Sequence, residues 1–433
     1  MLIEKHGYKF AEYVCFKEGK ENFDQPHVIS ADPPMKLPGG IERLVEAFKK
    51  SKEVPIGKEV DAKAGGEKDV TLKAKKLFIV GGAVRDYLLG HTPSNYDLAT
   101  DAHPDEVERI AMHARPPIQV VKKDPKQGIV RVAVDGETYD IETMRLPTSG
   151  PEQHTTFTAD PKDDSLRRDC TINALYYDPN GHKIYDYAGG LRHLKDGTVK
   201  MIGKAEDRIK EDGMSKFRVA RMLNKVPGAK LHDEDKMAFQ KGMEDGSDDV
   251  DQMEMAPEKI RDEFWRGMED LHVNAVRYLK TYQDMGLLKQ VFPKLELSFD
   301  FPDCKTCKTR PLVLAALLKN NKPVKLVERL KELKYTDREI KDAVFLINLL
   351  LFKPEYIYDF KTEMMKTSLT KRQILDWAKI NKLNLDMIEK LVNHQFTTNP
   401  SEIQSREGLA GEDLKDKVRR MEASAFMRAM RQG

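Results

Sequence analysis

The stretch from Leu77 to Thr100, LFIVGGAVRDYLLGHTPSNYDLAT, decides how this chain folds. Its apolar start, Leu77 to Val80, predicts a buried strand that ends in the Gly81-Gly82 pair. A helical segment with Arg85 follows, and a turn leads to a second strand that carries Asp97. The bare backbone N–H groups of such a glycine turn can approach phosphate oxygens, and Arg85 can add a planar cationic fork. An acidic residue on the neighbouring strand can hold a divalent metal, so the stretch predicts a triphosphate site.

Further blocks follow this stretch in a fixed order. They read YDIETMR (Tyr139–Arg145), RRDCTINAL (Arg167–Leu175), DYAGGL (Asp186–Leu191), EDGMSKFRVAR (Glu211–Arg221), APEKIRDEF (Ala256–Phe264) and GLLKQVFPKL (Gly286–Leu295). Together with GGAVRDYLLG they resemble the class II template-independent RNA nucleotidyltransferases. That family comprises the tRNA CCA-adding enzymes and the bacterial poly(A) polymerases. The resemblance extends over residues 76–297.

Hydrophobic patterning predicts an α/β region followed by helices. Strands are expected at 77–80, 96–98, 118–121, 129–134, 139–143 and 183–185, and helices at 84–89 and 104–113. After Glu206, apolar spacing at three and four predicts helices at 219–225, 260–269, 276–284, 313–319, 325–333, 340–351 and 372–380. We therefore expect an α+β protein that is helical to its end.

The resemblance implies a domain plan for this α+β chain. A nucleotidyltransferase palm, with a mixed sheet and helices, is expected at 76–203. A helical neck with the nucleotide-selection helix is expected at 204–297, and an RNA-binding helical body and tail at 298–433. Residues 1–75 are interpreted as an N-terminal extension, and the Lys-, Glu- and Gly-rich segment 49–75 as a flexible linker.

The implied reaction is attack by an RNA 3′-hydroxyl on the α-phosphorus of a nucleoside triphosphate, with Mg²⁺ in a two-metal site. Residues i and i+2 of a strand share a face, so the family's D-x-D places two carboxylates together. Here the positions are Asn95-Tyr96-Asp97, and an amide replaces the first carboxylate. Asp97 and Asn95 are the predicted metal ligands, and Asp140 is a candidate third carboxylate. An ordinary solvated strand residue is the equal alternative for Asp140.

The RRDCTINAL block has predicted nucleotide contacts. By resemblance, Arg168 faces the triphosphate, while Asp169 and Asn173 hold the ribose and the local turn. An alternative interpretation makes Asp169 the N-cap of a helix at 171–176 and Arg167 a surface cation.

The EDGMSKFRVAR block corresponds to the family's base-selecting E-D-x-x-R pattern. Glu211 and Asp212 are present, but Ser215 stands at the arginine position. Arg218 and Arg221 keep the next two basic positions and are predicted nucleotide contacts. The competing interpretation is a solvated helix face.

Bulk properties set weaker limits on function. The formal net charge of +2 favours no particular partner. Residues 231–270 hold 5 Lys/Arg against 14 Asp/Glu, and residues 311–433 hold 23 against 17. The mildly basic tail suits an RNA backbone and a solvated helical surface equally well. Cys304 and Cys307 form a lone C-x-x-C, for which two reduced thiols are favoured over half a metal site or a redox pair.

No signal peptide and no apolar run of membrane-spanning length is expected, so the sequence indicates a cytoplasmic protein. The expected partners are tRNA or another RNA 3′-end, with ATP and CTP. The segment 146–156, LPTSGPEQHTT, lacks the basic element of the family's flexible loop, and His154 is interpreted as a surface residue.

The sequence is compatible with three interpretations of function. CCA addition to tRNA leads, with poly(A) addition as its close alternative. Asn95 and Ser215 favour a weakened or inactive relative that only binds RNA. The third interpretation is a helical interaction protein that has kept the head domain of an ancestral enzyme.

Overall fold

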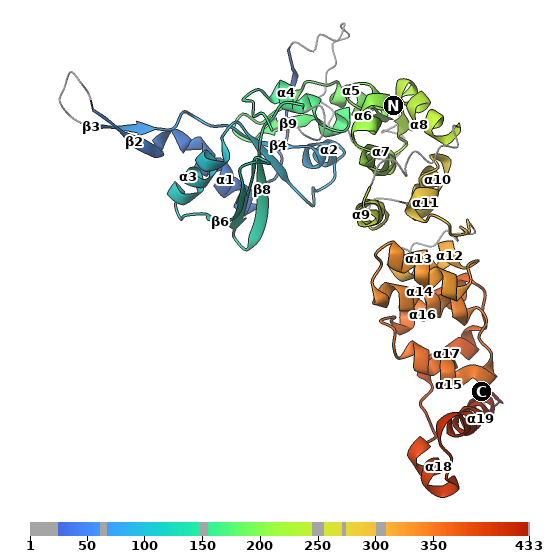
Figure 1. Cartoon of the computed structure of the whole chain (residues 1–433). Helices are drawn as coiled ribbons and strands as arrows, with labels where there is room; N and C mark the ends of the chain where they lie inside the picture. The colour runs from blue at the N-terminus through green and yellow to red at the C-terminus, as the bar shows by residue number, and fades with distance from the viewer. Residues whose placement is uncertain are drawn as a thin grey trace. The chain divides into compact units, whose positions relative to one another are not determined.

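The computed structural model describes residues 25–60, 67–147, 155–244, 255–270, 274–299 and 309–431. The chain divides into two compact units, Met1–Asp249 and Val250–Gly433. We call them the head unit and the helical unit, and describe each by itself (Figure 1).

An eight-stranded mixed sheet forms the centre of the head unit. Its strand order is β1-β10-β9-β4-β5-β8-β7-β6. The strands are β1 (His27–Ser30), β4 (Leu77–Val80), β5 (Asp97–Thr100), β6 (Gln119–Asp124), β7 (Ile129–Val134), β8 (Glu137–Thr143), β9 (Leu175–Asp178) and β10 (Lys183–Asp186). Within this sheet only β5 and β8 pair in parallel. β4 therefore lies in the middle of the sheet, and its four residues are all buried.

The two faces of this sheet differ in composition. Leu98, Ile141 and Val130 lie in register across β5, β8 and β7, and all three are buried. They belong to the face on which α1 and α3 pack. The opposite face carries Asp97 and the residues in line with it, and we call it the Asp97 face.

Helices of the head unit surround the sheet. They are α1 (Gly39–Lys49), α2 (Gly82–Leu88), α3 (Pro104–His113), α4 (Pro161–Leu166), α5 (Gly190–Asp196), α6 (Ala205–Glu211), α7 (Met214–Lys225) and α8 (Asp233–Glu244). Two 3₁₀ turns span Ser51–Glu53 and Thr171–Asn173, and two small sheets pair β2 (Pro55–Val60) with β3 (Glu67–Thr71) and β11 (Thr198–Val199) with β12 (Lys230–Leu231).

The N-terminal segment departs from the sequence expectation. β1 pairs antiparallel with β10 and so extends the main sheet, and α1 packs on α3 and β7. Ile41, Leu44 and Phe48 of α1 are buried. The described part of the N-terminal extension, from β1 onward, is therefore integrated into the fold of the head unit. Segment 49–75, expected to be a flexible linker, contains the β2–β3 hairpin.

The predicted helix at 171–176 is also wrong. Only Thr171–Asn173 is helical, as a 3₁₀ turn, and strand β9 begins at Leu175. Tyr176 and Tyr177 are fully buried in the sheet, where aromatic residues are favoured. Asp169 caps no helix, because the residue that precedes the turn is Cys170 and no side chain caps it.

The helical unit contains α9 (Pro257–Met268), α10 (Ala275–Asp284), α11 (Leu288–Val291), α12 (Arg310–Leu318), α13 (Pro323–Glu332), α14 (Asp337–Leu349), α15 (Ile357–Met364), α16 (Lys371–Ile380), α17 (Leu385–Asn393), α18 (Pro400–Glu407) and α19 (Gly411–Arg431). A 3₁₀ turn spans Pro354–Tyr356. Buried aromatic rings around Phe264 hold its first helices together, and the Trp265 indole N–H donates to the Tyr335 hydroxyl at 3.0 Å. In the described parts of the chain, no helix is both long and apolar enough to span a bilayer.

Candidate active site

The glycine turn lies between an acidic and a basic side chain. Gly81 follows β4 with φ +71°, a conformation that favours glycine. A Cβ on Gly81 would lie 3.6 Å from Asp97 Oδ2 and 3.6 Å from Arg168 Nη1. The bare backbone therefore leaves room for a ligand beside a carboxylate and a guanidinium. Gly82 begins α2, and a Cβ there would lie 3.4 Å from Arg85.

Asp97 is positioned by the register of the sheet. It pairs with Val80, the last residue of β4, and so stands beside the glycine turn. Asn95 lies just before β5 rather than within it, and its Nδ2 donates to Asp97 Oδ1 at 3.1 Å. Although solvent reaches Asp97, nearby protein atoms displace part of its water. This burial, together with the negative charge of Glu142, raises the pKa of the Asp97 carboxyl above its ordinary value.

Two further carboxylates share the Asp97 face of the sheet. The parallel pairing of β5 and β8 places Asp140 and Glu142 on that face. Asp140 accepts two hydrogen bonds from Arg131, both 2.7 Å, and Glu142 accepts one from Arg167 at 3.1 Å. Each carboxylate therefore faces an arginine. Sequence reasoning singled out Asp140 but missed Glu142, although the strand alternation in YDIETMR places both on one face.

The donor set fits a divalent metal only in part. Asp97 is the carboxylate at the glycine turn, and the Asn95 amide is already its hydrogen-bond donor. Nowhere in the described residues do three or more His, Cys, Asp or Glu side chains gather as a metal centre would require. The residues therefore suit one cation held by Asp97 and by oxygens of a bound triphosphate. They do not match the expected two-metal site.

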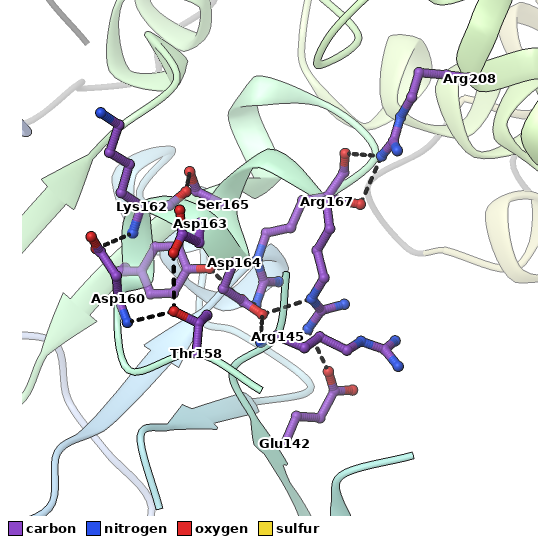
Figure 2. A network of polar contacts seen from close by, with 12 residues as sticks. Glu142, Arg145, Thr158, Asp160, Lys162, Asp163, Asp164, Ser165, Arg167 and Arg208 are labelled. Carbon is purple, nitrogen blue, oxygen red and sulfur yellow. Dashed lines mark hydrogen bonds and ion pairs between the residues drawn. The ribbon is translucent and has the colours of Figure 1, made fainter. Parts of the chain in front are cut away.

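A cluster of arginines surrounds the buried Asp164 of α4 (Figure 2). Arg168 Nη2 donates to Asp164 Oδ2 at 3.1 Å, and Arg167 Nε donates to Asp164 Oδ1 at 2.6 Å. Burial would raise the pKa of Asp164, but these two arginines outweigh it and hold that pKa below its usual value. Arg168 also lies over the ring of Tyr176, whose hydroxyl donates to Asp164. Its Nη1 is thereby aimed at the glycine turn.

Arg145 adds a third guanidinium to this cluster. Its backbone N–H donates to Asp164 at 3.0 Å, whereas its guanidinium has no hydrogen-bond partner within the described residues. Burial and the nearby charge of Arg167 lower the pKa of Arg145. An anion would relieve this repulsion between like charges, so the cluster is suited to bind phosphate. Arg167, interpreted as a surface cation, is instead largely buried here.

Arg85 occupies a different position from the expected one. It is buried, and its Nε and Nη2 donate to Asp86 Oδ1 at 2.9 and 2.7 Å. Its Nη1 donates to Asn173 Oδ1 at 2.5 Å, and Asn173 Nδ2 donates to Asp169 at 3.1 Å. The structure thus connects three predicted nucleotide contacts in one chain of hydrogen bonds. It points to Arg85 as a residue that positions Asn173, since its guanidinium is already occupied.

The segment predicted to select the base is not one helix. α6 ends at Glu211 and α7 begins at Met214, with Asp212 in the break. Asp212 Oδ1 accepts from the Met214 N–H at 3.0 Å, and Asp212 Oδ2 accepts from Arg218 at 2.9 Å. Ser215 is buried and donates to the carbonyls of Asp212 and Arg208. Arg221, which also lies on α7, has an interaction partner.

Arg208 of α6 joins this segment to the arginine cluster. Its Nη2 donates to the backbone carbonyls of both Arg167 and Arg168 at 2.7 Å (Figure 2). Sequence reasoning missed this residue because the contact is to backbone atoms and carries no charge pattern. Cys304, Cys307, His154 and most of the 146–156 loop lie outside the described residues.

Known proteins resemble this chain in sequence. Residues 77–200 match the family described as the poly A polymerase head domain. The CCA-adding enzyme of Lactobacillus johnsonii is 27% identical over 343 residues, which is 76% of this chain and 78% of that protein. The enzyme of Staphylococcus aureus is 26% identical over 378 residues, 80% of this chain and 88% of that protein.

Solved structures show the same fold. The Bacillus stearothermophilus CCA-adding enzyme in complex with CTP has a TM-score of 0.62 at 19% identity. The match covers 92% of this chain and 99% of that one. A structure of a CCA-adding enzyme with ATP has a TM-score of 0.63 at 17% identity, with 92% and 93% covered.

Proposed function

This chain belongs to the class II template-independent nucleotidyltransferase family, and from that premise we propose that it adds CCA to the 3′-end of tRNA from CTP and ATP. The observation that carries the proposal is the glycine turn between Asp97 and Arg168. A cytoplasmic location is part of the proposal, because tRNA and both nucleotides are abundant there.

The chain's own residues can perform the binding and orientation steps. The backbone at Gly81 gives the triphosphate a close approach, and Arg168 Nη1 with the open Arg145 guanidinium supplies positive charge to its oxygens. Asp164 accepts from the Arg168 guanidinium and from the Arg145 backbone N–H, which holds both residues in place for phosphate binding. Such preorganised charge stabilises the pentacovalent phosphorus as negative charge builds on its oxygens.

Asp97 supplies negative charge on the other side of the turn. A divalent ion held there would help the 3′-hydroxyl lose its proton and would balance charge on the leaving pyrophosphate. Burial and, after it, repulsion from Glu142 raise the pKa of Asp97, and a bound cation would reduce the repulsion. In this proposal Asp140 is not the main ligand of the cation, because Arg131 already pairs with it.

Base selection is proposed to rest on Asp212 and Arg218. Ser215 is buried and bonded to backbone carbonyls, so it is not positioned to read a base. Arg218 pairs with Asp212 while both remain partly exposed, which leaves a donor and an acceptor facing solvent. Arg221, Asp169 and Asn173 stay predicted nucleotide contacts.

A second candidate function is RNA binding with little catalysis. Two observations favour it: the Asn95 amide, which donates to Asp97 where the family's D-x-D has a carboxylate, and the Arg131 pair that neutralises Asp140. Both lower the negative charge available to hold a cation.

The deciding experiment incubates the full chain with tRNA that lacks its CCA end, each radiolabelled triphosphate and Mg²⁺. Incorporation of C and then A is the expected result. A long A-tail would indicate poly(A) synthesis, and retained tRNA binding without incorporation would indicate the second candidate.

A pair of glycine variants tests the turn within the same assay. Gly81→Ala and Gly136→Ala both place a side chain at positive φ, but only the Cβ at Gly81 faces Asp97 and Arg168. We expect Gly81→Ala to weaken CTP and ATP binding at least tenfold and Gly136→Ala to leave it unchanged. Equal affinities would remove the turn from the site.

A further inference from the structure

A cavity opens on the Asp97 face of the head unit. It has a volume of about 560 Å³ and lies where β4 begins, beside the β9–β10 turn and the start of α4. Three aromatic residues, Phe78, Tyr185 and Tyr187, contribute to its lining. Charged residues of both signs also line it, among them Lys76, Asp160 and Asp178. We call it the aromatic pocket.

Sheet register places the aromatic pocket next to the candidate active site. Tyr185 pairs with Tyr176, and Tyr176 pairs with Val80, so these side chains share the face that carries Asp97. Phe78 precedes Gly81 by three residues on β4. At 3.3 Å per residue this is about 10 Å, close to the span of one or two nucleotides.

The aromatic rings of the pocket pack edge to face with their neighbours. Phe78 and Tyr185 meet edge to face at 6.3 Å, and Tyr187 meets Tyr176 edge to face at 6.1 Å. Both Tyr185 and Tyr187 are partly exposed. In the described part of the chain neither hydroxyl has a hydrogen-bond partner, so both can donate to a ligand. Unpaired bases commonly stack on such aromatic side chains.

The charged lining supplies both acceptors and a donor. Asp160 uses Oδ1 to cap α4 through the Lys162 N–H at 2.8 Å, and Asp178 uses Oδ1 for the Asn180 N–H at 2.9 Å. The second carboxylate oxygen of each residue therefore remains available to accept a hydrogen bond from a ligand. The ammonium group of Lys76 makes no ion pair with any described residue. The two carboxylates would repel a simple anion, and the Lys76 ammonium would repel a simple cation. A nucleobase instead carries amino donors and ring acceptors on one edge.

From this combination we infer that the aromatic pocket binds an unpaired base of the RNA substrate, near the 3′-end that receives the nucleotide. The inference rests on the proposed function for the identity of that RNA. It extends the function by naming a base-binding subsite on the sheet itself.

Helix α4 connects this subsite to the arginine cluster. Asp160 caps its start, and Asp164 near its end holds Arg167 and Arg168 (Figure 2). Thr158 adds a second link, because its hydroxyl donates to Asp163 and accepts from the Asp160 N–H. A base in the pocket would therefore contact the same six-residue helix that orients the phosphate-binding side chains.

Fluorine NMR of the full chain labelled with 3-fluorotyrosine tests the inference. The resonances of Tyr185 and Tyr187 are assigned by their disappearance in Tyr185→Phe and Tyr187→Phe. We expect both resonances to shift when tRNA lacking its CCA end is added. Neither should shift with the same concentration of CMP or AMP. Unmoved resonances on tRNA addition would overturn the inference, and so would an equal shift with CMP or AMP.

Binding measurements with leucine variants provide the second readout. Tyr185→Leu and Tyr187→Leu keep apolar volume but remove the stacking surface. Each should weaken tRNA binding about tenfold, as expected for loss of one stacked base. Tyr139→Leu, on the opposite face of the sheet, is the matched control and should not weaken it. Unchanged binding in both pocket variants, with intact thermal unfolding, would reject the subsite.

These readouts separate the inference from the proposed function. If the wild-type chain adds no nucleotide while the two resonances still shift with tRNA, the proposed function fails and the subsite stands. If nucleotides are added and the resonances do not move, the subsite fails alone.

Discussion

At the scale of single residues, Asn95 controls the charge beside Asp97. Asn95→Asp should raise the nucleotide-addition rate in Mg²⁺ by a factor on the order of a hundred, because a second carboxylate strengthens cation binding worth several kcal/mol. Without metal, the lost hydrogen bond and the new repulsion should slightly lower the melting temperature. Single-turnover rates at matched Mg²⁺ measure the effect, with Asn95→Ala as the control that should stay slow. Equal rates for Asp and Ala would show that position 95 does not contact the cation.

Arg85 is a second single-residue determinant, and its effect should be on folding. Arg85→Met leaves the buried Asp86 with Lys225, at 3.4 Å, as its remaining cation. The free energy of unfolding should fall by about 3–5 kcal/mol, because breaking a buried ion pair leaves an uncompensated charge. Arg131→Met removes an exposed ion pair with Asp140 and should cost no more than about 1 kcal/mol. Urea denaturation of both variants measures these free energies of unfolding. A small loss of stability in Arg85→Met would favour Arg85 as a direct phosphate ligand.

At the scale of elements, α6 holds the arginine cluster through one side chain. Arg208→Met removes two hydrogen bonds to the carbonyls of Arg167 and Arg168. Charge-assisted bonds of this kind contribute about 1.5–3 kcal/mol each, so CTP and ATP affinity should fall at least tenfold. Lys210→Met, exposed on the same helix, is the control. Calorimetric titration measures the affinity. Undiminished nucleotide binding in Arg208→Met would show that the arginine cluster keeps its geometry without the Arg208 side chain.

The elements also show what sequence patterning can and cannot predict. The patterns at 129–134 and 104–113 correspond to β7 and α3 to the residue, because their apolar spacing is regular and their caps are local. The pattern at 171–176 failed because strand pairing with β4 and β10, not local spacing, determines β9. β1 was missed for the same reason, since its partner strand lies far along the chain.

The candidate site divides along similar lines. Gly81, Asp97 and Arg168 could be singled out because the glycine turn and the RRD block are local motifs; the structure brings the three together, and their roles stay predictions. Glu142 and Arg145 depend on strand pairing, and Arg208 on contacts to backbone atoms, so a single sequence gave no direct signal for their roles. The burial of Arg85 and its bonds to Asp86 and Asn173 could not be predicted, because they depend on the packing of the head unit.

At the scale of the whole molecule, acid should destabilise the head unit first. His193 is buried against Thr171 and His232, and burial with nearby positive charge lowers its pKa to about 4. Because the unfolded imidazole titrates near 6.5, the unfolded state binds more protons below that pH. Stability is therefore retained above pH 6.5 and lost as the pH falls toward 4, by about 2 kcal/mol at pH 5.

The helical unit should respond at lower pH. Burial would raise the pKa of Glu422, but hydrogen bonds from Thr398 and His394 hold it below its usual value. Its stabilising effect is thus present above about pH 4.5 and lost below. Hydrogen exchange between pH 6.5 and 5 should show faster opening around His193 than around Glu422. His193→Gln should flatten the pH response, whereas His113→Gln, an exposed control, should not. Uniform opening of both units would contradict this order.

The pairing of β1 with β10 has a consequence for synthesis of the protein. Residues 27–30 leave the ribosome long before residues 183–186, yet the two segments form adjacent strands of one sheet. At ordinary translation rates the interval is on the order of ten seconds. Until β10 emerges, the first strand has no native partner and the sheet cannot be completed at this edge. Folding of the head should therefore begin around β4 to β8 and finish when the oldest part of the chain is recruited last.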